Sequence, residues 1–468
     1  HPRCPPPVRP DRTSPRLTAG GVGGHLRSLA IPMAIGFVAM NSYAIADTYF
    51  VGQLGTLPLA AMGFTFPVAF AMISVGLGVG IATSSIVARL LGAGNRETVQ
   101  RIVTHAIILG FVLGVMLLAI GLGTMEPMFR ALGADERTLP LIGQYMRVYY
   151  FGSAFVILPM VGNFAIRATG NALAPSLIMV FAALTNIVLD PLLIFGLLGF
   201  PRLELAGAAI ATVVSNVATV AASMAVLYYR ERLILPRYLS LEGLWDSWSR
   251  LLHVAIPATI TNLFVPVIIA FITALVAGFG PEAVAGFGVA SRLESVVWIV
   301  IFALQSSLAP FVGQNYGAFL MDRVRHATDL SNKFLLAYGL IIAAVLFLVA
   351  QPVASVFDDN PLVVSAAVSY LRIVPISYGA FGLMMVTVAC FNSLGRPKSA
   401  TLLTFVKLFV VYLPMAWLLS IPYGLTGIFV ATGIAHILFG VVSIVWLRSF
   451  LRELEGGSAA VAGAHAGN

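Results

Sequence analysis

Charged residues are scarce in this chain. Only 10% of its 468 residues are Asp, Glu, Lys or Arg, whereas 59% are hydrophobic, and the mean hydropathy is +0.95. A soluble globular domain has roughly 45–50% apolar and about 25% charged residues, so the composition excludes an ordinary soluble fold. Apolar stretches of about 18 residues or more recur along the chain, and each can cross about 30 Å of hydrocarbon as a helix. The composition predicts an integral membrane protein.

Cysteine is also nearly absent. Cys4 and Cys390 are far apart and lie in unlike sequence surroundings, so the sequence implies no disulfide framework and no cysteine metal site. The apolar runs do not alternate with polar residues, which argues against a membrane barrel, and a bilayer leaves helices as the other way to satisfy the backbone. We therefore expect an all-α membrane protein with twelve transmembrane helices, over 28–50, 59–88, 101–123, 139–163, 173–199, 206–229, 251–278, 283–313, 331–353, 366–391, 401–421 and 424–449.

The chain is an internal duplication. A shift of 225 positions superposes Pro32 on Pro257, Tyr145 on Tyr370 and Gly170 on Gly395, among other pairs. Six helices per repeat is an even number, so both repeats enter from the same side and are parallel, with a cleft expected between them. The predicted organisation is a disordered cytoplasmic tail (1–27), an N-terminal lobe (28–229), a cytoplasmic linker (230–250), a C-terminal lobe (251–449) and a cytoplasmic C-terminal tail (450–468).

Basic residues gather in alternate loops. If the N-terminus is cytoplasmic, the inner segments hold most of the arginines, whereas the outer loops hold only Arg130, Arg137 and Arg202 among several carboxylates. Because cytoplasmic loops are enriched in Lys and Arg, both termini are predicted to face the cytoplasm.

Three carboxylates fall inside the apolar spans: Asp47, Asp190 and Glu294. A charge at the bilayer centre costs at least about 2.5–3.5 kcal/mol, so such residues are candidates for function. Tyr43 precedes Asp47 by one helical turn, and Asn186 precedes Asp190 by the same spacing, so each pair shares a helix face. These side chains could form one polar pocket suited to a proton or Na⁺.

The duplication supports a functional role for the polar residues of the N-terminal lobe. Under the 225 shift, Asp47 aligns with Ile272, and Asn186 and Asp190 align with Val411 and Met415. A requirement of the architecture should act on both copies, whereas a site needed once can survive in one lobe. We therefore predict a coupling-ion site in the N-terminal lobe; the alternative is that these carboxylates only bond to neighbouring helices.

Other charged residues in the spans have simpler explanations. Arg292 and Glu294 form a weaker polar candidate in the second lobe, and either could pair elsewhere and stabilise the helix. Arg147, Arg372 and Lys407 lie near span ends, where a long cationic side chain can reach the membrane interface.

Several side chains are weak candidates for a substrate cleft. They are Tyr43, Asn163, Met40, Phe64 and Phe287, although lipid-facing or core packing explains most residues of these types. The sequence has no paired catalytic histidines, no nucleophile with a base at suitable spacing and no phosphate loop in a strand context. We expect neither an enzyme nor a nucleic-acid partner.

Four stretches resemble the signature regions of the multidrug and toxic compound extrusion (MATE) transporters. They are ADTYFVGQLGTLPLAAMGFTFPV at 46–68, RLLGAGN at 89–95, NFAIRATGN at 163–171 and LTNIVLDPLLIFG at 184–196. The resemblance covers the chain after its tail. It implies a V-shaped pair of six-helix bundles that exports organic, often cationic, compounds in exchange for H⁺ or Na⁺, as a monomer in the bacterial inner membrane and without another cofactor.

Within that family, the sequence is more similar to the DinF-type branch. The resemblance implies that Tyr145 and Thr212 complete an ion-coupling cluster with Asp47, Asn186 and Asp190, and that Na⁺, if used, binds at the last three. Protonation or cation binding at Asp47 would rearrange the first helix and weaken substrate binding. The alternatives are a lipid-linked oligosaccharide flippase, an exporter of an endogenous metabolite and a channel.

Overall fold

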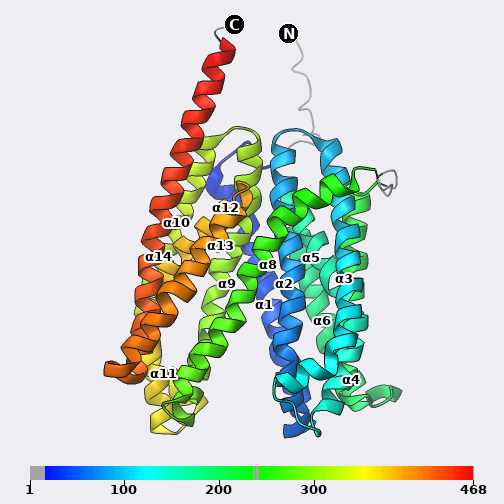
Figure 1. Cartoon of the computed structure of the whole chain (residues 1–468), viewed down its shortest axis with the longest axis vertical. Helices are drawn as coiled ribbons and strands as arrows, with labels where there is room; N and C mark the ends of the chain where they lie inside the picture. Colours follow the sequence, from blue (N-terminus) through cyan, green and yellow to red (C-terminus); the bar gives the residue numbers. More distant parts are fainter. Residues whose placement is uncertain (1–15, 236–237, 239–241, 467–468) are drawn as a thin grey trace, which may run out of the picture.

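A computed structural model describes residues 16–235, 238 and 242–466. Throughout this part of the chain, the regular structure is helical (Figure 1). The helices are α1 (Val22–Gly52), α2 (Thr56–Gly92), α3 (Arg96–Ala131), α4 (Leu139–Phe151), α5 (Ser153–Ala168), α6 (Leu173–Phe195), η1 (Leu197–Gly199), α7 (Glu204–Ala225), η2 (Val226–Arg230), α8 (Leu244–Ala277), α9 (Pro281–Gly317), α10 (Met321–Phe357), α11 (Pro361–Ile373), η4 (Val374–Ser377), α12 (Tyr378–Ser393), α13 (Pro397–Phe405), η5 (Val406–Tyr412) and α14 (Leu413–Ala466).

These helices make twelve membrane crossings in the described residues. Ten segments are long and apolar enough to cross singly, and α4 with α5 forms one more crossing bent by 49°. The segment Pro397–Glu455 counts twice, because the backbone leaves the helical region at Gly424 (φ 58°, ψ −141°). The hydroxyl groups of Tyr412 and Thr432 are 2.9 Å apart, whereas twenty residues of straight helix would span about 30 Å. The chain therefore turns back at Gly424.

The two repeats break the same crossing at the same place. In the first repeat, α4 ends and α5 begins around Gly152, where a Cβ would lie 2.3 Å from Val213 of α7. In the second, the short 3₁₀ segment η4 separates α11 from α12 and ends at Ser377, which is 225 positions after Gly152. The structure thus has two similar six-crossing bundles, a first bundle (α1–α7) and a second bundle (α8–α14).

The buried cores show where these bundles meet. At the end away from the termini, one core belongs wholly to the first bundle and another wholly to the second. At the end that carries both termini (Figure 1), each core combines residues of both bundles: Leu251 of α8 packs with α2 and α3, and Leu29 of α1 packs with α9. The bundles are joined at one end and separate at the other, as expected for a V.

Glycines on α2 and α9 show how far the contact between the two bundles extends. A Cβ on Gly78 would lie 2.0 Å from the Thr259 hydroxyl oxygen, and one on Gly92 would lie 2.0 Å from the Gln314 carbonyl oxygen. Further from the termini, Gly63 of α2 and Gly288 of α9 have no atom within 4 Å of the Cβ position. We call the space between the facing surfaces of α1, α2, α8 and α9 beyond Gly78 the interbundle cleft.

The segment before α1 links the two bundles, so the expected disordered tail over 1–27 is wrong from residue 16 onward. Leu17 is 2% exposed, and its N–H donates to the Gln314 side chain (3.1 Å), whose amide nitrogen donates to the Ala168 carbonyl (2.7 Å). Burying these polar groups requires such pairing. Residues 1–15 lie outside the described part. Of the expected linker, 236–237 and 239–241 also lie outside it, and α8 already begins at Leu244; α14 continues to Ala466.

Gly92→Ala is expected to destabilise the joined end, because the new methyl group would overlap the Gln314 carbonyl. Overpacking of this kind costs about 1–3 kcal/mol, so the melting temperature of the purified protein should fall. Gly63→Ala is the matched control on the same helix and should melt like the wild type, since its Cβ position is open. Equal melting of the two variants would contradict the proposed close contact.

Candidate ion-coupling and substrate site

Four helices of the first bundle bring polar side chains together in the interior of that bundle. Three pairs are spaced by one helical turn, and the rings of one pair, Tyr145 and Tyr149, stack at 5.9 Å. Both carboxylates are buried: Asp47 is 5% exposed and Asp190 is fully buried. Both carboxylates are close enough for their charges to act on Tyr43 and Tyr145. The cluster consists of Tyr43 and Asp47 (α1), Tyr145 and Tyr149 (α4), Asn186 and Asp190 (α6) and Thr212 (α7).

The amide of Asn186 connects the cluster. In one orientation its nitrogen donates to the Thr212 hydroxyl oxygen at 3.3 Å. Turned over, the nitrogen donates to an Asp190 carboxylate oxygen at 2.8 Å, and the amide oxygen accepts from the Thr212 main-chain N–H at 3.2 Å. Tyr43 also lies close to the Thr212 side chain. The Asn186 amide therefore lies between Asp190 of α6 and Thr212 of α7 and can bond to both.

The carboxylates retain unused bonding capacity. The Oδ1 atoms of Asp47 and Asp190 are buried and have no hydrogen-bond partner among the described residues, and the two groups are close enough for the charge of Asp47 to act on Asp190. Buried polar atoms are normally paired, so each exception needs an explanation. A proton or a monovalent cation would supply the missing partner. The described residues contain no cluster of three metal-binding His, Cys, Asp or Glu side chains, so Na⁺ would need the neighbouring amide and hydroxyl oxygens as well.

One tyrosine of the cluster was not expected. Tyr43, expected both in this polar pocket and as a weak cleft candidate, lies close to Thr212 and Asp47. Tyr149 was not predicted at all, although its place one turn after Tyr145 in the YMRVYY stretch could have indicated a shared face.

The second bundle has its own buried polar centre. Glu294 is 8% exposed and accepts a hydrogen bond from Tyr370 (3.0 Å), the residue that the 225 shift pairs with Tyr145. The expectation that Lys407 reaches the interface is wrong: it is 4% exposed, its ammonium lies 4.8 Å from the ring centroid of Phe381, and its charge acts on Glu294. Lys407 lies in the π-helical segment η5, and such segments are frequent at functional sites.

The remaining cleft candidates have different surroundings. Met40 is 37% exposed, Phe64 packs against the core of the first bundle, and the ring of Phe287 lies 5.7 Å from that of Tyr370. Asn163 is half-buried, with a side-chain oxygen that has no partner among the described residues. Arg292 is exposed although it is three helical turns inside α9.

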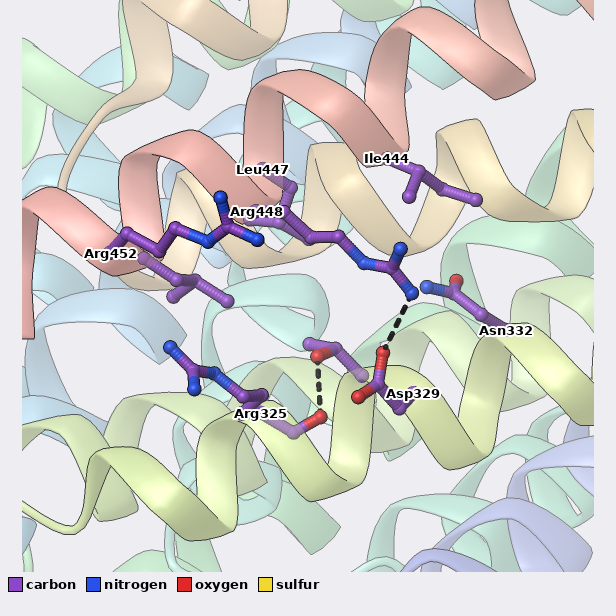
Figure 2. A pocket seen from close by; sticks show the side chains of 9 residues that line it. Arg325, Asp329, Asn332, Ile444, Leu447, Arg448 and Arg452 are labelled. Carbon is purple, nitrogen blue, oxygen red and sulfur yellow. Dashed lines mark hydrogen bonds and ion pairs between the residues drawn. The ribbon is translucent and has the colours of Figure 1, made fainter.

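A separate pocket lies near the end that carries the termini, between α10 and α14 (Figure 2). Arg448 faces Asp329 there at 3.5 Å, and Arg325 pairs with Glu455. This pocket contains residues of the second bundle only and is therefore distinct from the Asp47 cluster.

Comparison with known proteins gives three results. The family model MatE matches residues 32–192 and 257–418, two segments whose first residues are 225 positions apart. The chain is 39% identical over 425 residues to a protein named FAD transporter from Shewanella oneidensis, covering 91% of this chain and 94% of that one. It is 25% identical, with the same coverage, to the probable multidrug resistance protein YoeA of Bacillus subtilis. The structure of the Vibrio cholerae MATE transporter VcmN in the bent form superposes with a TM-score of 0.86 at 30% identity, covering 92% of this chain and 97% of that one.

Twelve crossings in two parallel bundles, with buried carboxylates beside a cleft, define a multi-pass membrane transporter. The chain belongs to the MatE family. The predicted family and fold class are thus confirmed, whereas the DinF-type branch and the roles of individual residues stay predictions.

Thr212→Val tests the contact between α6 and α7. The change keeps the shape and removes the hydroxyl group next to Asn186, so we expect weaker ion-coupled transport and a loss of about 1 kcal/mol in stability. The control is Thr219→Val, seven residues further along α7, whose hydroxyl only bonds to the Ser215 carbonyl of its own helix. Transport in vesicles and thermal melting measure both effects. Equal transport by the two variants would mean that the Thr212 hydroxyl does not serve the site.

Glu294 and Lys407 should be energetically coupled. Removing one member of a buried charge pair leaves the other uncompensated, at a cost of about 3–5 kcal/mol, whereas removing both is much less harmful. We expect Glu294→Gln and Lys407→Met to melt well below the wild type and the double variant to recover part of the loss. Additive losses in this cycle would show that the two charges do not interact.

Proposed function

We propose that this transporter is a secondary active exporter of small organic compounds, a multidrug efflux antiporter driven by H⁺ or Na⁺. The observation that carries the proposal is the pair of buried carboxylates, Asp47 and Asp190, with partnerless oxygens in the first bundle. A transmembrane carboxylate without a counter-ion is costly unless it takes up a proton or a cation. Asp47 is the main ion-binding group in this proposal, while Asp190, Asn186, Tyr145 and Thr212 position it.

In the proposed cycle, the ion and the substrate prefer different conformations of the transporter, one open to the outside and one open to the inside. In this proposal the termini face the cytoplasm. The support is that their end of the molecule carries several basic residues, among them Arg16, Arg96, Arg167 and Arg323. The described conformation is then open outward. Ion entry from outside neutralises Asp47, releases the contacts around it and favours the inward-open form, in which substrate binds. Ion and substrate need not touch, provided that each prefers a different state.

One observation favours a second candidate substrate. The FAD transporter of Shewanella oneidensis is 39% identical to this chain, whereas YoeA of Bacillus subtilis is 25% identical, at the same coverage. An endogenous flavin dinucleotide is therefore a candidate beside cationic drugs. An oligosaccharide flippase has less support, because the two relatives compared above are named as a FAD transporter and a probable multidrug resistance protein.

Asp47→Asn is expected to abolish efflux of ethidium or FAD from cells while the protein remains inserted. Dissipating the H⁺ and Na⁺ gradients in turn identifies the ion, since only the coupled gradient sustains wild-type efflux. Asp246→Asn is the control, because Asp246 is exposed at the joined end and, among the described residues, forms its ion pair with Arg250 on its own helix (3.1 Å). Normal pumping by Asp47→Asn would refute the proposed role of Asp47.

A further inference from the structure

The facing surfaces of the cleft carry almost no charge. From Gly78 outward on α2, and over the corresponding parts of α1, α8 and α9, the charged residues are Asp47, Glu282, Arg292 and Glu294. Asp47 and Glu294 are buried within their own bundles, and Glu282 is the second residue of α9, at the mouth. Arg292 is the one exposed charge that remains at depth on these four described surfaces.

The helical repeat shows which way Arg292 points. Eleven residues make about three turns, so Arg292, Ala303 and Gln314 lie near one line along α9. Ala303 is buried in the core shared by the two bundles, and Gln314 bonds to Ala168 of the first bundle. Arg292 lies on this same face of α9 and therefore also points toward the first bundle. At its level the two bundles have separated. Met40 of α1, 37% exposed, lies seven residues beyond Met33 of that shared core and so faces the cleft too.

The guanidinium group has no ion-pair partner in the described part of the chain. The main-chain carbonyl of Arg292 accepts a hydrogen bond from the Ser295 hydroxyl (2.7 Å). Glu294 is about 200° around the helix from Arg292, and its carboxylate bonds to Tyr370 inside the second bundle. Arg292 lies about 17 Å along α9 from its outer end. An unpaired charge at such depth is expensive unless it faces a water-filled path or a ligand.

We infer that the interbundle cleft accepts organic anions, and that Arg292 binds their phosphate or carboxylate group while the apolar walls hold a flat ring system. Guanidinium presents a rigid fork of donors that matches both kinds of anionic group. A cation in the same cleft would be repelled by the guanidinium group of Arg292, and no exposed carboxylate lies nearby on these surfaces to offset the repulsion. This inference rests on the proposed export function and specifies its substrate class.

The test compares FAD, riboflavin and ethidium, since riboflavin shares the flavin ring of FAD but lacks its phosphates. Uptake of each into phosphatidylcholine vesicles is measured with the driving gradient applied, for the wild type and Arg292→Gln. We expect the variant to lose FAD transport about tenfold or more and to transport riboflavin as well as the wild type does. Ethidium transport should not fall, because the change removes a repelling charge from the cleft. Arg292→Lys should retain part of the FAD transport, since it keeps the charge and loses the fork.

Two controls separate the possible outcomes. Arg372→Gln removes another exposed arginine of the second bundle, one that stacks on Phe347 away from the cleft (5.3 Å), and it should transport FAD normally. Asp47→Asn should stop transport of every substrate. Undiminished FAD transport by Arg292→Gln, or a wild type that transports ethidium but not FAD, would overturn the inference and leave the export function intact. A wild type that transports none of the three would overturn both.

Discussion

The structure depends on keeping two carboxylates, Asp47 and Asp190, inside the part of the protein that crosses the membrane. Their burial is tolerable only because α1, α4, α6 and α7 surround them with hydroxyl and amide groups and because a proton or cation can complete their bonding. The bend at Gly152 brings α4 and its two stacked tyrosines to this position. The first bundle is organised around a charge that must be neutralised, and this requirement can link ion entry to movement.

The second bundle repeats the architecture and changes the chemistry. Its bend falls at the equivalent position, and Tyr370 occupies the place of Tyr145, but the carboxylate it faces is Glu294 from α9 instead of a residue of α8. Lys407, in a π-helical segment, is a buried cation whose charge acts on Glu294. The first bundle thus holds two acidic groups, while the second holds one acidic and one basic group. This asymmetry agrees with an ion-coupling role for the first bundle alone.

Much of the fold could be predicted from the sequence, because twelve long apolar runs and a 225-residue repeat leave few alternatives. Asp47, Asn186 and Asp190 could be selected for the same reason: polar groups stand out in an apolar helix. Lys407 could not be placed, since its burial depends on Phe381 and Glu294, which are distant in sequence. The packing of Leu17 and the outward turn of Arg292 likewise depend on contacts between the bundles, which no local pattern encodes.

The central claim is that Asp47 exchanges its bound ion when substrate binds. Infrared difference spectroscopy of the purified protein measures this directly, because a protonated carboxyl group and a carboxylate absorb at different frequencies. For a proton-coupled transporter, the account predicts that substrate addition removes a protonated-carboxyl band from the wild-type spectrum and that Asp47→Asn lacks this change; for a Na⁺-coupled one, the carboxylate band shifts on Na⁺ addition instead. A carboxyl spectrum that responds to neither substrate nor ion, or responds equally in Asp47→Asn, would contradict the account.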